Sequence, residues 1–92
     1  MIKSFRHDGL KRFFERGSKA GIPARHAKKL QLILAVLQSA THPHDANFPG
    51  SRLHELGGDR QGTWSVDVTG NWRITFRFDG QDVTDVNFED TH

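Results

Sequence analysis

The chain has 92 residues, of which 35% are hydrophobic and 26% charged, a composition that excludes a disordered tail and leads us to expect a single domain over residues 1–92. It has no cysteine, which excludes disulfides and thiolate metal sites. Its longest apolar run, residues 32–37, is too short to span a membrane. Because the first residues also lack the apolar core of a secretory signal, we expect a cytoplasmic protein with no membrane partner. The net charge is only +2, but residues 1–44 carry +7 and residues 45–92 carry −5, which indicates either a polyanionic or acidic partner or two solvated faces of opposite sign.

The first predicted helix covers residues 9–16. Asp8 is its expected N-cap, and Gly17 is its expected stop because glycine readily adopts the left-handed conformation that ends helices. The apolar side chains on one face of this helix are Leu10, Phe13 and Phe14. Residues 2–5, which precede it, are a candidate extra strand.

A second helix is predicted from Pro23 to about Ala40, since proline fits the first turn of a helix. The apolar residues that follow its 3.6-residue period are Ala27, Leu30, Ile33, Leu34 and Leu37. His26, Lys28 and Lys29 lie outside this stripe, so we expect them on the solvent side of the helix.

The second half of the chain changes to the two-residue period of strands. Strands are predicted over residues 64–69 and 72–78, an opening strand at 52–56, and a further strand after the Asp79-Gly80 turn. We therefore expect an α+β fold in which two N-terminal helices pack on one face of a small twisted antiparallel sheet. Alternation along the strand at 72–78 assigns Arg73, Thr75 and Arg77 to the open face.

Histidines are the first candidates for chemistry. His42-Pro43-His44 has the spacing of a metal-binding pair, but no third ligand follows at a suitable distance, so a solvated loop is favoured and we expect no metal or other cofactor. His7 and His26 lie beside basic residues and are expected to face solvent.

The predicted sheet carries arginine and histidine side chains that can bind a phosphate group. Arg52 and His54 are two residues apart on one predicted strand, so they share a face with each other. If that strand pairs in the same sheet, Arg52 and His54 can lie on the same open face as Arg73 and Arg77. Arg60 lies in a glycine-rich connection that lacks the lysine of a nucleotide-binding P-loop.

The chain end adds Asp90 and His92, which project to one side if this segment is extended; a frayed tail is the alternative. Imidazole, carboxylate and guanidinium groups are what metal-free RNA cleavage requires. A base takes the proton of the ribose 2′-hydroxyl, arginines stabilise charge on the phosphoryl oxygens, and an acid protonates the leaving oxygen. Taken one at a time, these residues fit a solvated surface equally well.

Several stretches occur in an order and spacing that point to a known family. The most specific are Arg52-Leu53-His54, Gly58-Asp59-Arg60, Trp64-Ser65-Val66, Asn71-Trp72-Arg73-Ile74-Thr75-Phe76 and the closing Glu89-Asp90 with His92. The chain thereby resembles the HigB toxins of the RelE/HigB superfamily, the ribonucleases of bacterial type II toxin–antitoxin systems. The resemblance implies a RelE-like, microbial-RNase-like fold and a ribosome-dependent endoribonuclease that cleaves mRNA in the ribosomal A site and so inhibits translation.

The resemblance also implies roles for particular residues. Catalysis would depend on His54, Arg73, Asp90 and His92, with Arg73 at the scissile phosphate and the other three supplying acid–base chemistry and orientation; which is base and which is acid stays open. RNA or phosphate contacts are expected from Arg52, Arg60, Arg77, Lys28 and Lys29.

The implied partners are a HigA-like helix-turn-helix antitoxin and the ribosome, through 16S ribosomal RNA and the A-site mRNA. Operator DNA would be reached only indirectly, through the antitoxin. Two positions depart from the family pattern, since Gly57 stands where a lysine is usual and Thr91 where a tyrosine is usual. These departures leave an alternative, a weakened or catalytically silent module of the same fold that binds the ribosome or the antitoxin.

Overall fold

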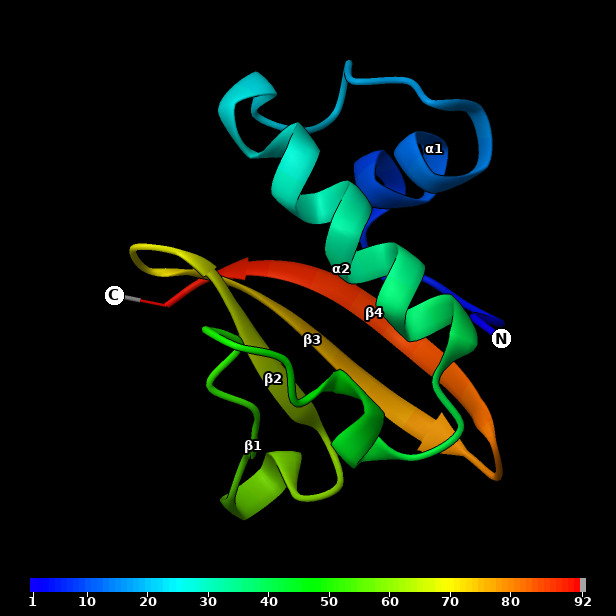
Figure 1. Cartoon of the computed structure of the whole chain (residues 1–92), viewed down its shortest axis with the longest axis vertical. Coiled ribbons are helices and arrows are strands. Elements are labelled where there is room, and N and C mark those ends of the chain that lie inside the picture. Colours follow the sequence, from blue (N-terminus) through cyan, green and yellow to red (C-terminus); the bar gives the residue numbers. More distant parts are fainter. Residues whose placement is uncertain (92) are drawn as a thin grey trace.

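The computed structural model of the chain describes residues 1–91, so the predicted site residue His92 lies outside the described part. Two helices, α1 (Asp8–Arg16) and α2 (Ala27–Ser39), pack on one side of a four-stranded antiparallel sheet (Figure 1). The strands lie side by side in chain order: β1 (His54–Glu55), β2 (Trp64–Thr69), β3 (Trp72–Asp79) and β4 (Asp82–Asp90). Short 3-10 helices cover residues 24–26, 43–46 and 58–60. The predicted α+β fold class is confirmed.

The ends of α1 show one correct and one wrong prediction. Gly17 ends the helix as expected, with φ of +73° and its N–H bonded to the carbonyl of Phe13. The N-cap is His7, whose Nδ1 accepts the N–H of Leu10 at 2.9 Å, and Asp8 is already the first helical residue. The imidazole thus supplies the acceptor that the sequence analysis assigned to a carboxylate.

The apolar stripe predicted for the second helix is buried as expected. Its five side chains, from Ala27 to Leu37, are each no more than 7% exposed. His26 was expected in solvent, which is wrong, because it is only 3% exposed and its ring packs near Trp72 and Phe88. A 3-10 turn at residues 24–26 precedes the α-helix and turns this imidazole toward the end of the sheet. Burial, with the charge of Arg25, lowers the pKa of His26 and favours its neutral form.

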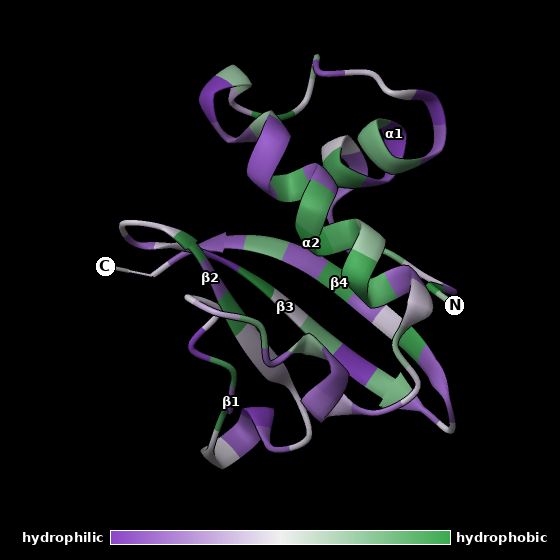
Figure 2. Ribbon diagram, in the orientation of Figure 1, coloured by the Kyte–Doolittle hydropathy of each residue, from purple (hydrophilic) through white to green (hydrophobic). Residues whose placement is uncertain are grey.

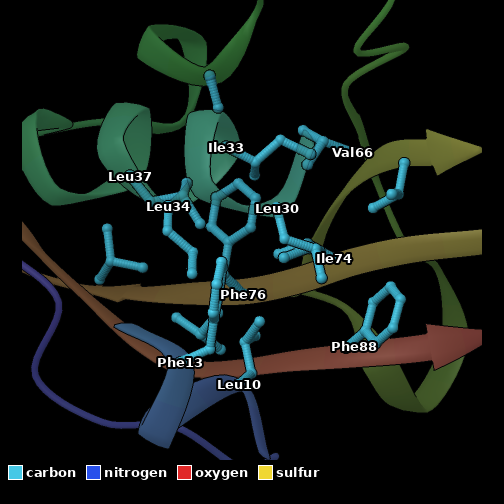
Figure 3. Packing of buried hydrophobic residues seen from close by; sticks show 14 of the residues in the cluster. Leu10, Phe13, Leu30, Ile33, Leu34, Leu37, Val66, Ile74, Phe76 and Phe88 are labelled. Atoms are coloured by element: carbon cyan, nitrogen blue, oxygen red, sulfur yellow. The ribbon is translucent and has the colours of Figure 1, made fainter. Parts of the chain in front are cut away.

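The core lies between the helical layer and the sheet. Hydrophobic and hydrophilic residues alternate along β3 and β4 (Figure 2), so each strand offers one apolar face to the helices. Figure 3 shows the Phe76 side chain pointing from β3 toward α2, beside Leu30 and Leu34. All three side chains are at most 1% exposed. Neither helix of residues 1–91 is long and apolar enough to cross a bilayer.

Two predicted strands are shorter than expected. The opening strand, expected at 52–56, is only His54–Glu55, because Arg52 adopts a left-handed φ of +49° that extended pairing does not allow. Residues 2–5 form two isolated parallel bridges to β4, Ile2 with Val83 and Phe5 with Val86. The N-terminal segment therefore lies along β4 without becoming a strand of its own.

Gly9 and Gly21 fix the approach of α1 to the loop that follows it. A Cβ added to Gly9 would lie 2.3 Å from the carbonyl oxygen of Gly21, which is backbone and cannot move aside cheaply. We expect Gly9→Ala to lower the free energy of unfolding by about 1–3 kcal/mol, the usual effect of overpacking. Urea unfolding measures this. The matched control is Gly57→Ala, whose added Cβ meets no atom within 4 Å, and equal midpoints for the two variants would contradict the prediction.

Candidate functional site

The candidate site is the face of the sheet turned away from α1 and α2. Residues directly opposite each other in antiparallel strands have their side chains on the same face, so the register defines which groups meet there. One row across the four strands is His54, Ser65, Thr75 and Asn87. The neighbouring row is Asp67, Arg73 and Glu89. The register thus places Arg73 between two carboxylates, with the His54 row beside it.

Glu89 is the best anchored carboxylate of this face. The connection between β1 and β2 carries Arg60 over the sheet, where its Nη1 and Nη2 donate to the two oxygens of Glu89 at 2.9 and 2.6 Å. Thr75 Oγ1 and Asn87 Nδ2 also donate to Glu89. Hydrogen bonds from Arg60 hold the pKa of Glu89 below its usual value, although partial burial acts in the opposite direction. The hydrogen bonds to Glu89 in turn raise the pKa of Arg60.

This network corrects the expectation of a bare face. Thr75 was assigned to the open side of the sheet, but it is only 2% exposed, and Ser65 beside it is fully buried. Thr75 lies under the Arg60–Glu89 pair because its hydroxyl bonds to the same carboxylate oxygen that Arg60 binds. Alternation predicted the side of the sheet correctly, but it contains no information about a loop that folds back over that side.

Arg73 is left without a salt bridge among residues 1–91, although carboxylates flank it on both sides. Asp67 lies 3.6 Å from Arg52, and Glu89 lies 2.6 Å from Arg60, so both carboxylates are bound to other arginines. The Nε of Arg73 is buried and has no hydrogen-bond partner within the described part of the chain. A buried guanidinium N–H without a partner is a donor that an anion can satisfy.

His54 lies at the edge of this face, on β1. Its Nδ1 is 3.0 Å from the carbonyl oxygen of Arg52, and since a carbonyl can only accept, the ring carries its proton on Nδ1. In its neutral form the imidazole then presents Nε2 as a proton acceptor. Arg52 is not in the strand, but its contact with Asp67 brings its side chain to the same face, as predicted.

Not every predicted residue reaches this face. Asp90, the last residue of β4, lies opposite Trp72, so its side chain leaves the end of the sheet on the helical side. Lys28 and Lys29 belong to α2 and therefore lie in the helical layer. The carboxylates that do share the face of Arg73 are Asp67 and Glu89, of which only Glu89 was singled out in the sequence, as part of a motif. The register of β3 with β2 and β4 reveals both.

Titration of Glu89 predicts how stability depends on pH. Because its pKa is lowered in the folded state, its ion pair contributes fully at pH 7 and is lost as the pH falls below the usual value of 4.5 and through the folded-state pKa. We expect Glu89→Gln to reduce the stability lost between pH 7 and pH 3 by about 0.5–1 kcal/mol, the range of partly solvated pairs. Urea unfolding at both pH values measures this. Glu15→Gln, an exposed carboxylate of α1, should leave the pH dependence as in the wild type; equal behaviour of the two variants would refute the prediction.

No group of three or more His, Cys, Asp or Glu side chains in residues 1–91 is arranged to hold a metal ion. His42 instead contacts Asp45 at 3.3 Å, and His44 packs edge-on against Trp64. What the face between β1 and β4 offers is a set of guanidinium groups and one imidazole. The guanidinium groups can bind a phosphodiester, and the imidazole can exchange a proton with a hydroxyl group beside it.

The similarity of this chain to known proteins extends over its whole length. Residues 3–92 match a family described as the RelE-like toxin of the type II toxin–antitoxin system HigB. The sequence is 45% identical to Endoribonuclease HigB of Proteus vulgaris over 92 residues, which is 100% of each chain. The aligned region therefore includes both helices and all four strands.

Proposed function

The chain belongs to the HigB family of RelE-like toxins of type II toxin–antitoxin systems, and from this membership we propose that it is an endoribonuclease that cleaves mRNA in the ribosomal A site by acid–base catalysis and so inhibits translation. The single observation that carries the proposal is Arg73, a guanidinium on the face turned away from the helices, whose neighbouring carboxylates are both bound elsewhere. Such a group is matched to the scissile phosphate of an RNA strand.

In the proposed reaction, a base removes the proton of the ribose 2′-hydroxyl and the resulting oxygen attacks the adjacent phosphorus. Arg73 stabilises the negative charge that grows on the phosphoryl oxygens. An acid then protonates the leaving 5′ oxygen, and each proton transfer typically contributes about 10²–10⁴-fold. His54, Asp90 and His92 share the acid, base and orienting roles, with Asp90 acting from the end of β4 on the helical side and not from the face of Arg73 itself. The Nε2 of His54, made an acceptor by the bond of Nδ1 to Arg52, supports its part in proton transfer.

As a toxin of such a system, the protein has an antitoxin partner. We infer that this partner is a HigA-like helix-turn-helix protein, through which the toxin reaches operator DNA, and that both act in the cytoplasm. The ribosome is the second partner. Lys28 and Lys29 of α2, in the basic first half of the chain, would contact 16S ribosomal RNA. A small helix-turn-helix reading frame directly downstream would support this assignment.

Expression without the antitoxin tests the proposal. We expect growth arrest and new mRNA 5′ ends at in-frame positions of translated messages, with untranslated RNA left intact. Normal growth with intact messages would overturn the endoribonuclease proposal. The alternative, a silent module that binds the ribosome, would show co-sedimentation with ribosomes but no cleavage.

Gly57 and Thr91 are the observations that favour the alternative, and they give a prediction of their own. Gly57 has an ordinary extended φ of −101° and no atom near its added Cβ, so a lysine fits there without strain. We expect Gly57→Lys combined with Thr91→Tyr to raise the cleavage rate at least tenfold, since each restored group would contribute about 1–3 kcal/mol. Primer extension on translated mRNA measures the rate. Gly58→Lys is the control, because its φ of +61° strains any side chain; no gain in the double variant would show that these positions do not limit activity.

A further inference from the structure

Beside the face of Arg73 the surface contains a small polar hollow of about 140 Å³. Its lining brings together four parts of the chain that are far apart in sequence: Arg6, Asp59, Arg60, Thr63, Thr75, Arg77 and Asp85. Three guanidinium groups gather in this hollow, where anionic groups reduce the repulsion between like charges. The hollow has about the volume of five water molecules, too small for a nucleoside and sufficient for one phosphate group.

Two of the three guanidinium groups are held in place. Arg60 is fixed by its two hydrogen bonds to Glu89. Arg77 donates from Nη1 to Thr63 Oγ1 at 2.9 Å and to the carbonyl of Gln61 at 3.3 Å. It also lies against the backbone of Gly62, where an added Cβ would come within 3.0 Å of its Nη2. Donors that are positioned in advance lose little conformational freedom when a ligand binds.

Arg6 completes the hollow from the N-terminal segment. Its backbone N–H donates to the carbonyl of Val86 at 2.8 Å, which anchors the residue beside β4, while its exposed guanidinium forms no salt bridge with residues 1–91. The hydroxyl of Thr63 accepts from Arg77, so its own proton remains available to donate to a ligand. The hollow therefore combines three cations with a hydroxyl donor.

The charge of the lining indicates the kind of phosphate. Three arginines face the two carboxylates of Asp59 and Asp85 in the lining, and Glu89, which is bound to Arg60, offsets the third positive charge. A hollow with so little net charge suits the single negative charge of an internal phosphodiester better than the higher charge of a free or terminal phosphate. Arg73 and Arg77 are four residues apart on β3, about 13 Å along the strand, and Arg77 is held at Thr63 and Gln61, so we assign the two to different phosphate groups.

We propose that the hollow lined by Arg6, Arg60 and Arg77 binds a second phosphodiester of the RNA strand, separate from the scissile phosphate at Arg73. This inference rests on the proposed function, and it adds Arg6 to the residues that bind substrate. The subsite holds the strand at a second point and thereby positions the scissile bond on β3. Asp59 and Asp85 limit the charge of the site and so disfavour terminal phosphates.

The test measures binding without cleavage. A fluorescent 2′-O-methyl RNA heptanucleotide, which has no attacking hydroxyl, is titrated with the whole protein at several salt concentrations. We expect Arg6→Gln to weaken binding severalfold and to reduce the slope of log affinity against log salt by about 0.7, the value of one lost phosphate contact on a single strand. Arg6→Lys should restore most of the slope. Arg16→Gln removes an equal charge from α1 and should leave the slope unchanged.

Three outcomes would overturn the inference: equal slopes for Arg6→Gln and Arg16→Gln, no binding of the heptanucleotide by the wild type, or tighter competition by inorganic phosphate than by the internal diesters of a second oligonucleotide. Because the probe cannot be cleaved, a protein that binds it through Arg6 but leaves mRNA intact would support the subsite and contradict only the proposed ribonuclease activity. Thermal unfolding of each variant shows whether the fold is retained, and the backbone bond of Arg6 to Val86 is unaffected by these substitutions.

Discussion

Replacing Arg73 with alanine should lower the rate of mRNA cleavage by about 10²–10³-fold, the usual loss when one preorganised donor to a developing oxyanion is removed. The fold should survive the change, because Arg73 has no salt bridge whose partner would be left alone. Asp67 keeps its contact with Arg52, and Glu89 keeps its two bonds to Arg60. The rate is measured by primer extension on ribosomes translating a defined message, and the fold by circular dichroism.

Lysine at the same position separates charge from geometry. Arg73→Lys keeps the positive charge but not the two-pronged hydrogen bonding of a guanidinium, so we expect an intermediate rate. Arg16→Ala, on α1, is the control for a general loss of positive charge. Wild-type rates in a folded Arg73→Ala protein would reject Arg73 as the group that binds the scissile phosphate.

Phe76→Ala should produce the largest loss of stability, about 3–5 kcal/mol, because it deletes a fully buried ring at the centre of the sheet. The ring lies between β3 and α2, where the surrounding backbone can close only part of the cavity (Figure 3). A domain of this size has a total stability of only about 5–15 kcal/mol, so the variant would be close to unfolding at 37 °C. Urea unfolding followed by far-ultraviolet circular dichroism measures the change.

Phe78→Ala is the matched control, since it removes the same ring two residues further along β3 from a half-buried position. It should cost clearly less than Phe76→Ala. Similar midpoints for the two variants would mean that the two layers are not held together by the contact of Phe76 with α2.

The sequence predicted the layers and the sides of the sheet, because these follow from periods of 3.6 and 2 residues that the apolar residues display directly. The stripe from Ala27 to Leu37 and the alternation of Arg73 with Ile74 are examples. The residues at which the helices begin were predicted less accurately. A single 3-10 turn was enough to bury His26, and a cap one residue earlier than expected replaced Asp8 with His7.

What the sequence could not provide was the register of the strands. The pairing of β3 with β4 shifts between Thr75 and Arg77, where Asp85 adopts a left-handed φ of +55°. Continued from the turn, the pairing of Arg77 with Thr84 would place Phe88 opposite Arg73, and the bulge places Glu89 there instead. The sequence around Asp85 contains no pattern that predicts a left-handed conformation at a residue other than glycine. The burial of Thr75 was equally hidden, because it depends on Arg60, which is distant in sequence.

The N-terminal segment has a consequence for how a partner can recognise the protein. The carbonyls of Met1 and Ser4 accept from Val83 and Val86, and the N–H groups of Lys3 and Arg6 donate back to the same two residues. A partner that tried to extend the sheet by strand addition at this part of β4 would first have to displace that segment and break four main-chain bonds. An antitoxin that binds here without displacing the N-terminal segment must therefore recognise side chains and the shape of the surface, not main-chain hydrogen-bonding groups of β4.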